Sequence, residues 1–434
     1  MSWHTFTIDQ VKSDAPYSLV GGPFGSELTT RDYTEAGVPI IRGSNLSSDR
    51  KFFDDGYVFV SDEKAATLRS NTAYPGDIVF TQRGTLGQVG LIPQPSNFER
   101  YVVSQSQMKL TVNRQLALPA YVYYWFRQSS VAEMIRRRAI TSGVPHINLG
   151  ILKGFEIRLP SLVHQQNAVR VLDDFECLIE NNHRRIQLLE ESARLLYREW
   201  FVHLRFPGHE HNRIVDGLPE GWERRTLESV CSSGDGVQTG PFGSQLHQAD
   251  YSDGGVPVIM PKDIVDCRIS VTSIARIPET LADSLGRHRM APGDIVYGRR
   301  GDIGRRAFIG KHHAGWFCGT GCLRFRPNLL AINPLYLFDT LGAPDTLGTI
   351  TNRAKGSTMP NLSAGALKSV PLLVASRRLQ DIYVERVEDM REALNVLDEQ
   401  NQKLAQARDL LLPRLMSGEL RVADLASFDQ EAVA

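Results

Sequence analysis

Two long segments of the chain place apolar residues at alternating spacings of three and four. The first contains no glycine or proline from Gln166 to His203. Such a series, sustained over about four heptads, is typical of helices that pair as a coiled coil. We therefore predict one long helix in each segment. The two series are Leu172, Phe175, Ile179, Asn182, Ile186, Leu189, Ala193, Leu196 and Trp200, and, between Arg377 and Leu412, Val387, Met390, Leu394, Leu397, Asn401, Leu404, Arg408 and Leu411.

Each series carries one asparagine, and the two asparagines predict how the helices pair. In an antiparallel pair the numbers of facing residues add to a constant, and setting Asn182 opposite Asn401 makes the other layers match. A buried asparagine pair specifies register at some cost in stability. A stripe on a single buried helix, or a parallel pair, is the alternative. The predicted facing residues are Leu172 with Leu411, Phe175 with Arg408, Ile179 with Leu404, Ile186 with Leu397, Leu189 with Leu394, Leu196 with Val387 and Trp200 with Tyr383.

The rest of the chain shows short apolar runs separated by glycine and proline, which indicate strands. Examples are Val38–Ile41, Asp77–Thr81 and Tyr101–Val112. Helical stretches from Pro119 to Arg138 and from Pro334 to Leu341 begin with a proline, as the first turn of a helix allows. This pattern predicts an α/β (α+β) fold in which a curled, mixed sheet is combined with helices.

The same ordered set of motifs occurs twice, which indicates a tandem duplication of a unit of about 215 residues. A period this long excludes a solenoid, whose repeats are about 20–50 residues. Two copies of one domain suit a target with two related halves. The matching segments are Gly22–Ser26 with Gly240–Ser244, Gly37–Ile41 with Gly255–Ile259, Pro75–Phe80 with Pro292–Tyr297, Arg83-Gly84 with Arg300-Gly301, Asn148-Leu149 with Asn361-Leu362, and Trp3 with Trp222.

The repeat and the helical series together predict five parts of the chain. Each copy consists of a mixed α/β domain followed by a long helix. The predicted parts are a first recognition domain at 1–161, a central helix at 162–205, a second recognition domain at 206–373, a second helix at 374–418 and a tail at 419–434.

Composition narrows the class of protein. With 42% hydrophobic and 23% charged residues the chain is an ordinary globular protein, and 434 residues suffice for two or three domains. Its net charge of +0 means that any DNA contact relies on local basic patches or on partners. No run of 18 apolar residues and no leader are present, so we expect a cytoplasmic protein without a membrane span. Five cysteines form no disulfide framework.

Two motifs suggest chemistry, and the duplicate argues against both. Asn333-Pro334-Leu335-Tyr336 resembles the signature of adenine methyltransferases, but the matching segment begins with Leu118 and a helix start is the simpler interpretation. Cys318 and Cys322 with His312 and His313 suggest a metal site, but the aligned stretch in the first copy has neither residue type. Phosphate-loop, zinc-protease and nucleophile-elbow motifs are missing from the sequence. We therefore predict no catalytic residues and no metal site.

Polar side chains on the turns after two strands of each copy are the candidate DNA contacts. Arginine, lysine, asparagine, glutamine and aspartate are residue types that reach base edges in the major groove. Positions match between the copies while identities differ, as in Gln82 against Arg299. Solvated loop ends are the alternative interpretation. The predicted DNA-binding residues are Arg42, Asn45, Gln82, Arg83, Thr85, Lys262, Asp263, Arg299, Arg300 and Asp302.

The ordered motifs resemble those of the specificity subunits of type I restriction-modification enzymes, the HsdS family. The resemblance rests on the duplicated motifs and on the closing helix segments Leu195–Phe201 and Leu411–Leu420, and it covers essentially the whole chain. It implies two target-recognition domains that each read one half of a bipartite site in double-stranded DNA. It also implies that the two helices pair antiparallel and act as a spacer.

The resemblance further implies which partners the chain requires. Two modification subunits would dock on the helices, bind S-adenosylmethionine and methylate adenine at N6, and restriction subunits would add cleavage. The chain itself would have no cofactor. A methyltransferase or nuclease in its own right, or an architectural DNA binder, is the alternative. The residues predicted for helix pairing and partner docking are Asn182, Leu189, Leu196, Trp200, Phe201, Leu394, Asn401, Leu404 and Leu415.

Overall fold

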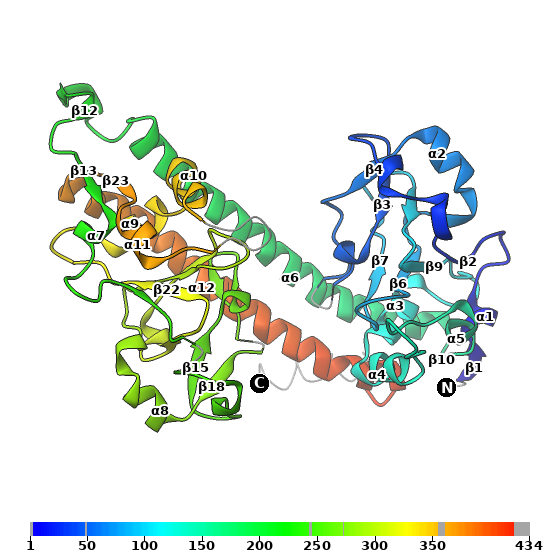
Figure 1. Ribbon diagram of the computed structural model, residues 1–434. Helices are drawn as coiled ribbons and strands as arrows, with labels where there is room; N and C mark the ends of the chain where they lie inside the picture. Colours follow the sequence, from blue (N-terminus) through cyan, green and yellow to red (C-terminus); the bar gives the residue numbers. More distant parts are fainter. Residues whose placement is uncertain (1–2, 48–49, 243–244, 272, 355–360, 421–434) are drawn as a thin grey trace, which may run out of the picture. The chain divides into compact units, whose positions relative to one another are not determined.

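The computed structural model describes residues 3–47, 50–242, 245–271, 273–354 and 361–420 (Figure 1). The described residues form two compact units. The first unit contains the residues up to Ile186 and those from Val396 onward, and the second contains Gln187–Asn395. Each unit therefore includes part of both long helices. The predicted tail lies outside the described residues from 421 onward.

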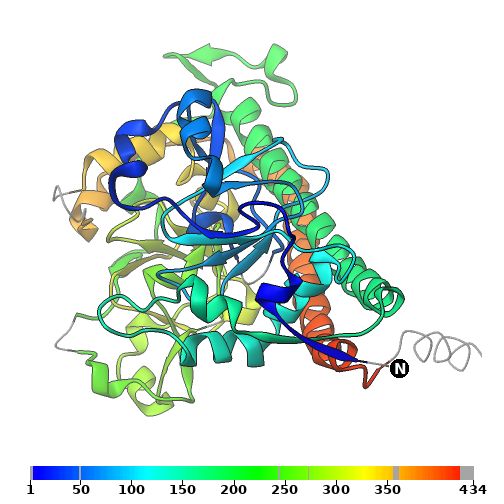
Figure 2. The ribbon, with the colours of Figure 1, turned by 90° about the vertical axis from the view of Figure 1, so that its right-hand side faces the viewer.

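The first unit contains two four-stranded sheets and a ribbon; Figure 2 looks onto this unit, whose strands are blue to cyan. The first sheet is antiparallel throughout, and the second contains one parallel pair, β3 with β8. In spatial order the first sheet is β2 (Leu19–Gly21), β9 (Gln107–Leu110), β6 (Ile78–Thr81) and β7 (Val89–Leu91); the second is β4 (Val58–Val60), β3 (Val38–Ile41), β8 (Tyr101–Val103) and β5 (Thr72–Ala73); the ribbon is β1 (His4–Thr7) with β10 (Glu156–Leu159).

The second unit repeats this topology, except that its second sheet has three strands and an isolated bridge, Arg289 with Phe317, stands at the place of β5. Its parallel pair, Ile259 beside Cys318, occupies the place of Ile41 beside Val103. The tandem duplication is thus confirmed. The first sheet of the second unit is β14 (Val237–Thr239), β22 (Cys322–Phe325), β19 (Ile295–Gly298) and β20 (Arg306–Phe308), and the second is β18 (Ala275–Ile277), β15 (Val256–Ile259) and β21 (Phe317–Cys318). The equivalent ribbon is β13 (Glu223–Thr226) with β23 (Pro371–Val374). Two further ribbons are β11 (Ile214–Val215) with β12 (Leu218–Pro219), and β16 (Ile264–Val265) with β17 (Arg268–Ile269).

Two predicted elements are each divided in the structure. The predicted strand Tyr101–Val112 is two strands, because a tight turn closed by the Gln107 N–H on the Ser104 carbonyl separates β8 from β9. The predicted helix Pro119–Arg138 breaks at Gln128, whose backbone is extended. The break lets both halves bury their apolar faces. The shorter helices are α1 (Ile8–Val11), α2 (Asp62–Thr67), α3 (Pro119–Arg127), α4 (Ser129–Arg137), α5 (Leu149–Lys153), α7 (Leu227–Val230), α8 (Glu279–Ser284), α9 (Pro334–Thr340), α10 (Pro344–Asn352) and α11 (Ala364–Lys368).

The long helices α6 (Leu162–Tyr197) and α12 (Arg377–Ser417) pair in the predicted register. In the first unit the Asn182 Nδ2 donates to the Asn401 Oδ1 at 3.0 Å, and both residues are buried. In the second unit the rings of Trp200 and Tyr383 lie 6.0 Å apart. These contacts confirm an antiparallel pair. A π-helical turn, Arg198–Val202, follows α6.

One predicted layer of the helix pair differs. Arg408, predicted to face Phe175, donates through its Nη1 to the Glu176 Oε1 at 2.8 Å. Arg408 and Glu176 are both buried, so this ion pair lies inside the seam. The apolar series does not include Glu176, and a charged residue next to the stripe carries no signal of burial. The apolar series therefore does not predict that Glu176 is the partner of Arg408.

A buried glutamine ties the start of each long helix to its own unit. The Gln165 Oε1 accepts the Leu118 N–H at 2.9 Å, just before α3. The Gln380 Oε1 accepts the Asn333 N–H at 2.8 Å, just before α9. Both glutamines are almost fully buried. The duplication therefore preserves a polar anchor that the sequence analysis did not identify.

The aspartate of each Pro-Gly-Asp segment connects a turn to the main sheet. The Asp77 carboxylate accepts the Tyr74 N–H at 2.9 Å and the Lys109 Nζ at 3.1 Å. The Asp294 carboxylate accepts the Ala291 N–H at 2.8 Å and the Arg326 Nη2 at 2.7 Å. Both carboxylates are only 2% exposed. Each one thus closes a turn and balances a cation on the neighbouring strand.

We expect Asp77→Ala to destabilise the protein by about 3–5 kcal/mol, because it leaves the buried Lys109 ammonium without a counter-charge. Urea unfolding measures this loss. Asp9→Ala is the matched control, since the Asp9 and Lys12 side chains of that ion pair are 44% and 31% exposed, and pairs open to solvent contribute at most about 1 kcal/mol. Equal losses in the two variants would contradict the structural role of Asp77.

Candidate nucleic-acid interface

Each unit has a surface hollow at the repeated Arg-Gly segment. The first hollow, in the first unit, has a volume of about 500 Å³, and the second hollow, in the second unit, has about 430 Å³. The two hollows share the repeated Arg-Gly segment, and the other segments that line them differ. The first is lined by Arg83, Gly84, Ser106, Ser142, Val144 and His146, and the second by Met260, Pro261, Lys262, Arg300, Gly301 and Thr320.

The loops that carry Arg83 and Arg300 are held by the neighbouring strand. After β6, the Gln82 N–H donates to the Ser106 carbonyl at 2.7 Å, and after β19 the Arg299 N–H donates to the Gly321 carbonyl at 2.9 Å. The next glycine in each loop has a positive φ, +98° at Gly84 and +75° at Gly301, which favours glycine. The backbone thus turns sharply and leaves the arginine side chain in solvent.

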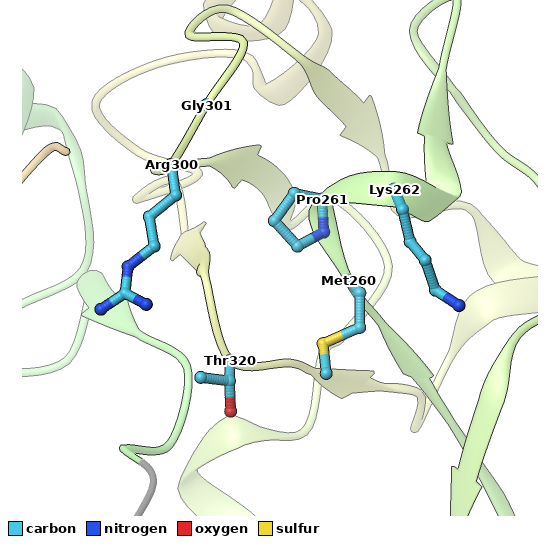
Figure 3. Close-up of a pocket in the computed structure, with 6 residues that line it drawn as sticks. All are labelled: Met260, Pro261, Lys262, Arg300, Gly301 and Thr320. Atoms are coloured by element: carbon cyan, nitrogen blue, oxygen red, sulfur yellow. The ribbon is translucent and has the colours of Figure 1, made fainter. Parts of the chain in front are cut away.

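Three separate segments border the second hollow (Figure 3). Met260 and Pro261 follow β15, Arg300 follows β19, and Thr320 lies between β21 and β22. The side chains of Met260, Arg300 and Thr320 border one common space, and Lys262 lies on the far side of Pro261 (Figure 3). A guanidinium and apolar groups therefore meet at one place on the surface.

Five of the predicted DNA-binding residues have exposed side chains. Of these, Arg83 lines the first hollow, and Lys262 and Arg300 line the second. Asp302 accepts a hydrogen bond from the Arg305 Nε at 2.9 Å, so its carboxylate is partly engaged. Gln82 and Arg42 are half-buried, and the Arg42 Nη2 donates to the Gly56 carbonyl at 3.1 Å. The exposed residues are Arg83, Thr85, Lys262, Arg300 and Asp302.

The structure contradicts the assignment of Asn45 and Asp263 as base contacts. Asn45 is 1% exposed; its Oδ1 accepts the Arg42 N–H, and its Nδ2 donates to two carbonyls. Asp263 is 3% exposed, and its carboxylate accepts the Met260 N–H at 2.9 Å. The Asn45 side chain closes the turn after β3, and the Asp263 side chain closes the turn after β15, which borders the second hollow. Their correct role is structural support.

Arg299 is also a supporting residue rather than a surface contact. It is 9% exposed, its Nε donates to the Asn361 Oδ1 at 3.3 Å, and its guanidinium lies 5.8 Å from the ring centre of Phe242. Burial lowers the pKa of the Arg299 guanidinium. The prediction of direct base contact by Arg299 is corrected accordingly. The position of a residue in a predicted turn does not show whether its side chain is buried beneath the loop or exposed to solvent.

The residues predicted for helix pairing and docking lie inside the units. Asn182, Trp200, Phe201, Leu394, Asn401 and Leu415 are buried, and Leu189, Leu196 and Leu404 are half-buried. Burial assigns them to the seam and to the cores. Docking of partner subunits on the helices stays a prediction.

The motifs that suggested chemistry have structural roles. The Asn333 Oδ1 accepts the Leu335 N–H and caps α9, which confirms the helix start. Cys318 and Cys322 are buried in a core cluster, and burial raises the pKa of the Cys318 thiol to about 12. Among the described residues, no three or more histidine, cysteine, aspartate or glutamate side chains gather as metal ligands. In the same part of the chain, no helix is both long and apolar enough to cross a membrane.

Comparison with known proteins agrees with the repeated topology. The family model described as "Type I restriction modification DNA specificity domain" matches residues 27–191 and again residues 219–405. The chain belongs to this family. The resemblance to type I specificity subunits that the motifs predicted is confirmed, including the tandem arrangement.

Individual relatives match along most of their length. The type I restriction enzyme MjaIX specificity subunit of Methanocaldococcus jannaschii is 22% identical over 437 residues, which cover 96% of this chain and 94% of that protein. The HindI specificity subunit of Haemophilus influenzae is 21% identical, with 80% and 86% covered. The crystal structure of the type I restriction-modification S subunit from M. genitalium matches with a TM-score of 0.54 at 18% identity over 96% of both chains. That likeness shows the fold.

We expect Asp263→Asn to leave the fold intact, because asparagine occupies the equivalent position in the first unit and keeps an acceptor for the Met260 N–H. Burial raises the pKa of the Asp263 carboxyl, against the Met260 hydrogen bond and the charge of Lys262. A raised carboxyl pKa means that this group's contribution to stability grows as pH falls from neutral through that pKa. The variant should therefore match or exceed the wild type in urea at pH 7, and lose that advantage on acidification.

The exposed Asp302→Asn variant is the control for this comparison and should unfold like the wild type at pH 7. A lower unfolding midpoint of Asp263→Asn than of Asp302→Asn at neutral pH would contradict the assigned role of the Asp263 carboxyl.

Proposed function

We propose that this chain is the non-catalytic reading subunit of a type I restriction-modification enzyme, and that each unit reads one half of a bipartite site in double-stranded DNA. The observation that carries the proposal is that each unit has a hollow at its repeated Arg-Gly segment, with an exposed arginine on a glycine turn. A shared scaffold places the same cation in each unit, while the other lining residues differ. A protein that reads two different short DNA sequences with one duplicated scaffold requires this combination of a shared cation and differing neighbours.

Arginine at the edge of each hollow suits base recognition. A guanidinium donates two parallel hydrogen bonds to the O6 and N7 of guanine, the commonest specific contact in the major groove. Arg83 and Arg300 are exposed, and the structure gives neither an ion pair with a carboxylate among the described residues. The guanidinium groups are thus available for DNA.

The partners supply what this chain does not. In the proposal, two modification subunits hold S-adenosylmethionine and methylate adenine at N6, and restriction subunits add cleavage. Because the chain has no net charge, these partners also neutralise part of the DNA backbone. The rival function, a methyltransferase in its own right, requires that the isolated chain bind S-adenosylmethionine. Calorimetric titration of the isolated chain with S-adenosylmethionine distinguishes the two.

The proposal is tested with Arg83→Ala and Arg300→Ala in the complex with the modification subunit. A bidentate contact is worth about 1–3 kcal/mol of discrimination against the wrong base. Each variant should therefore lose roughly tenfold or more of the preference for one base at one position of the methylated motif. Arg83→Ala should change one half-sequence and Arg300→Ala the other, so each variant is the control of the other. Single-molecule sequencing for N6-methyladenine measures the motif.

Two other outcomes would separate the roles of these arginines. A uniform fall in methylation across all sequences would mark them as phosphate contacts. An unchanged motif in both variants would refute reading at the hollows.

We further propose that the paired helices set the length of the unspecified spacer, because α6 and α12 each carry residues of both units. Inserting seven residues after Ile186 and seven after Val396 preserves the facing register. Seven helical residues add about 10 Å, or about three base pairs. The methylated motif should gain about three unspecified positions and keep both half-sequences.

The matched control inserts seven residues into α6 alone. This change shifts the α6 layers beyond the insertion by seven residues against α12, so the Asn182–Asn401 and Trp200–Tyr383 contacts cannot both form. It should therefore reduce the stability of the chain rather than lengthen the spacer. A double insertion that leaves the spacer unchanged would exclude the helices as the spacing element.

A further inference from the structure

The second hollow has an apolar side where the first unit has polar residues. The matched parallel strands align Met260 with Arg42, and Thr320 with Gln105. Pro261, which follows Met260, replaces Gly43. The two units therefore keep the arginine of the Arg-Gly turn and exchange the chemistry beside it.

The apolar groups of the second hollow are held in place. The Met260 side chain packs on a core cluster, and a Cβ on Gly319 would lie 2.6 Å from its Sδ, so the thioether rests directly against that glycine. The Thr320 hydroxyl donates to the Pro241 carbonyl at 3.1 Å. With its hydroxyl engaged, Thr320 contributes its methyl group to the surface. Pro261 has no N–H to donate.

In the first unit the equivalent positions are engaged in polar contacts. The Arg42 Nη2 donates to the Gly56 carbonyl, and the Gln105 Nε2 donates to the carbonyls of Gly25 and Leu28. Neither position presents a methyl or thioether group. The surface beside the Arg-Gly turn therefore differs in chemistry between the two units.

A ligand of the second hollow combines a hydrogen-bond acceptor or negative charge for Arg300 with an apolar group for Met260. In the major groove, thymine displays a methyl group at C5, and apolar side chains contact it. A neighbouring guanine or phosphate supplies the acceptor for the arginine. This combination fits a short sequence that contains thymine.

We propose that Met260, assisted by Pro261 and Thr320, contacts the 5-methyl group of a thymine in the half-site read by the second unit. This inference rests on the proposed function and goes further, because it names a base and the side chain that selects it. The first unit makes no such methyl contact at the equivalent position.

Replacing thymine with deoxyuridine removes only the 5-methyl group and tests the proposal. Once the Arg300→Ala variant has shown which half-sequence the second unit reads, each thymine on both strands of that half is replaced in turn in duplex oligonucleotides. The complex with the modification subunit should bind one of these duplexes about fourfold more weakly, as expected for one buried methyl-sized group. Fluorescence anisotropy at constant salt measures the affinities.

The Met260→Ala complex should bind the thymine and deoxyuridine duplexes equally well at that position. Met134→Ala, a half-buried methionine on α4 of the first unit, is the matched control and should keep the wild-type ratio. For deoxyuridine placed in the half-site read by the first unit, the ratio of the two affinities should be the same in the wild type and in both variants.

A half-site without thymine, an absent deoxyuridine effect, or an effect that survives in Met260→Ala would overturn the inference. Each of these results leaves the proposed function standing, because the complex still recognises a defined motif. Loss of all sequence specificity would instead refute the proposed function, and the inference with it.

Discussion

The buried hydrogen bond between Asn182 and Asn401 is the constraint that organises the rest of the chain. Two apolar helix faces tolerate several registers, but an asparagine amide buried against leucine leaves its hydrogen-bonding groups unsatisfied. With the two asparagines opposed, the Asn182 Nδ2 donates to the Asn401 Oδ1, which specifies the register. The Asn401 Nδ2 is buried without a hydrogen-bond partner among the described residues, which is part of the cost of such a buried pair. In that register Arg408 reaches Glu176, and Trp200 reaches Tyr383.

Polar anchors join the helices to the sheets in addition to the apolar cores. Gln165 connects the start of α6 to the segment before α3, and Gln380 connects the start of α12 to the segment before α9. Asp77 and Asp294 then balance cations in the main sheets and close the turn that precedes each Arg-Gly loop. The duplication preserves these buried groups because each one satisfies several neighbours, so a single substitution leaves a buried charge or amide unpaired.

The copies differ in the residues beside the repeated Arg-Gly loops. The scaffold supplies a sharp glycine turn and an exposed arginine in each unit, and the adjoining positions exchange polar for apolar groups, as from Arg42 to Met260. Side chains on such edges carry little of the folding free energy. They are therefore free to change with the DNA sequence, which is the property that a family of specificity subunits requires.

The sequence by itself determined the long helices, their register and the duplication, because these depend on periodicity and on the order of motifs along the chain. It also located the Arg-Gly loops and thus the arginines of both hollows. Only the tertiary structure decided which polar turn residues face solvent. Asn45, Asp263 and Arg299 occupy the same kind of turn as Arg83 and Arg300, yet they are buried beneath the loops they support. A side chain's position above or below a loop depends on contacts with distant segments, such as Phe53 for Asn45 and Asn361 for Arg299, and local sequence does not encode those contacts.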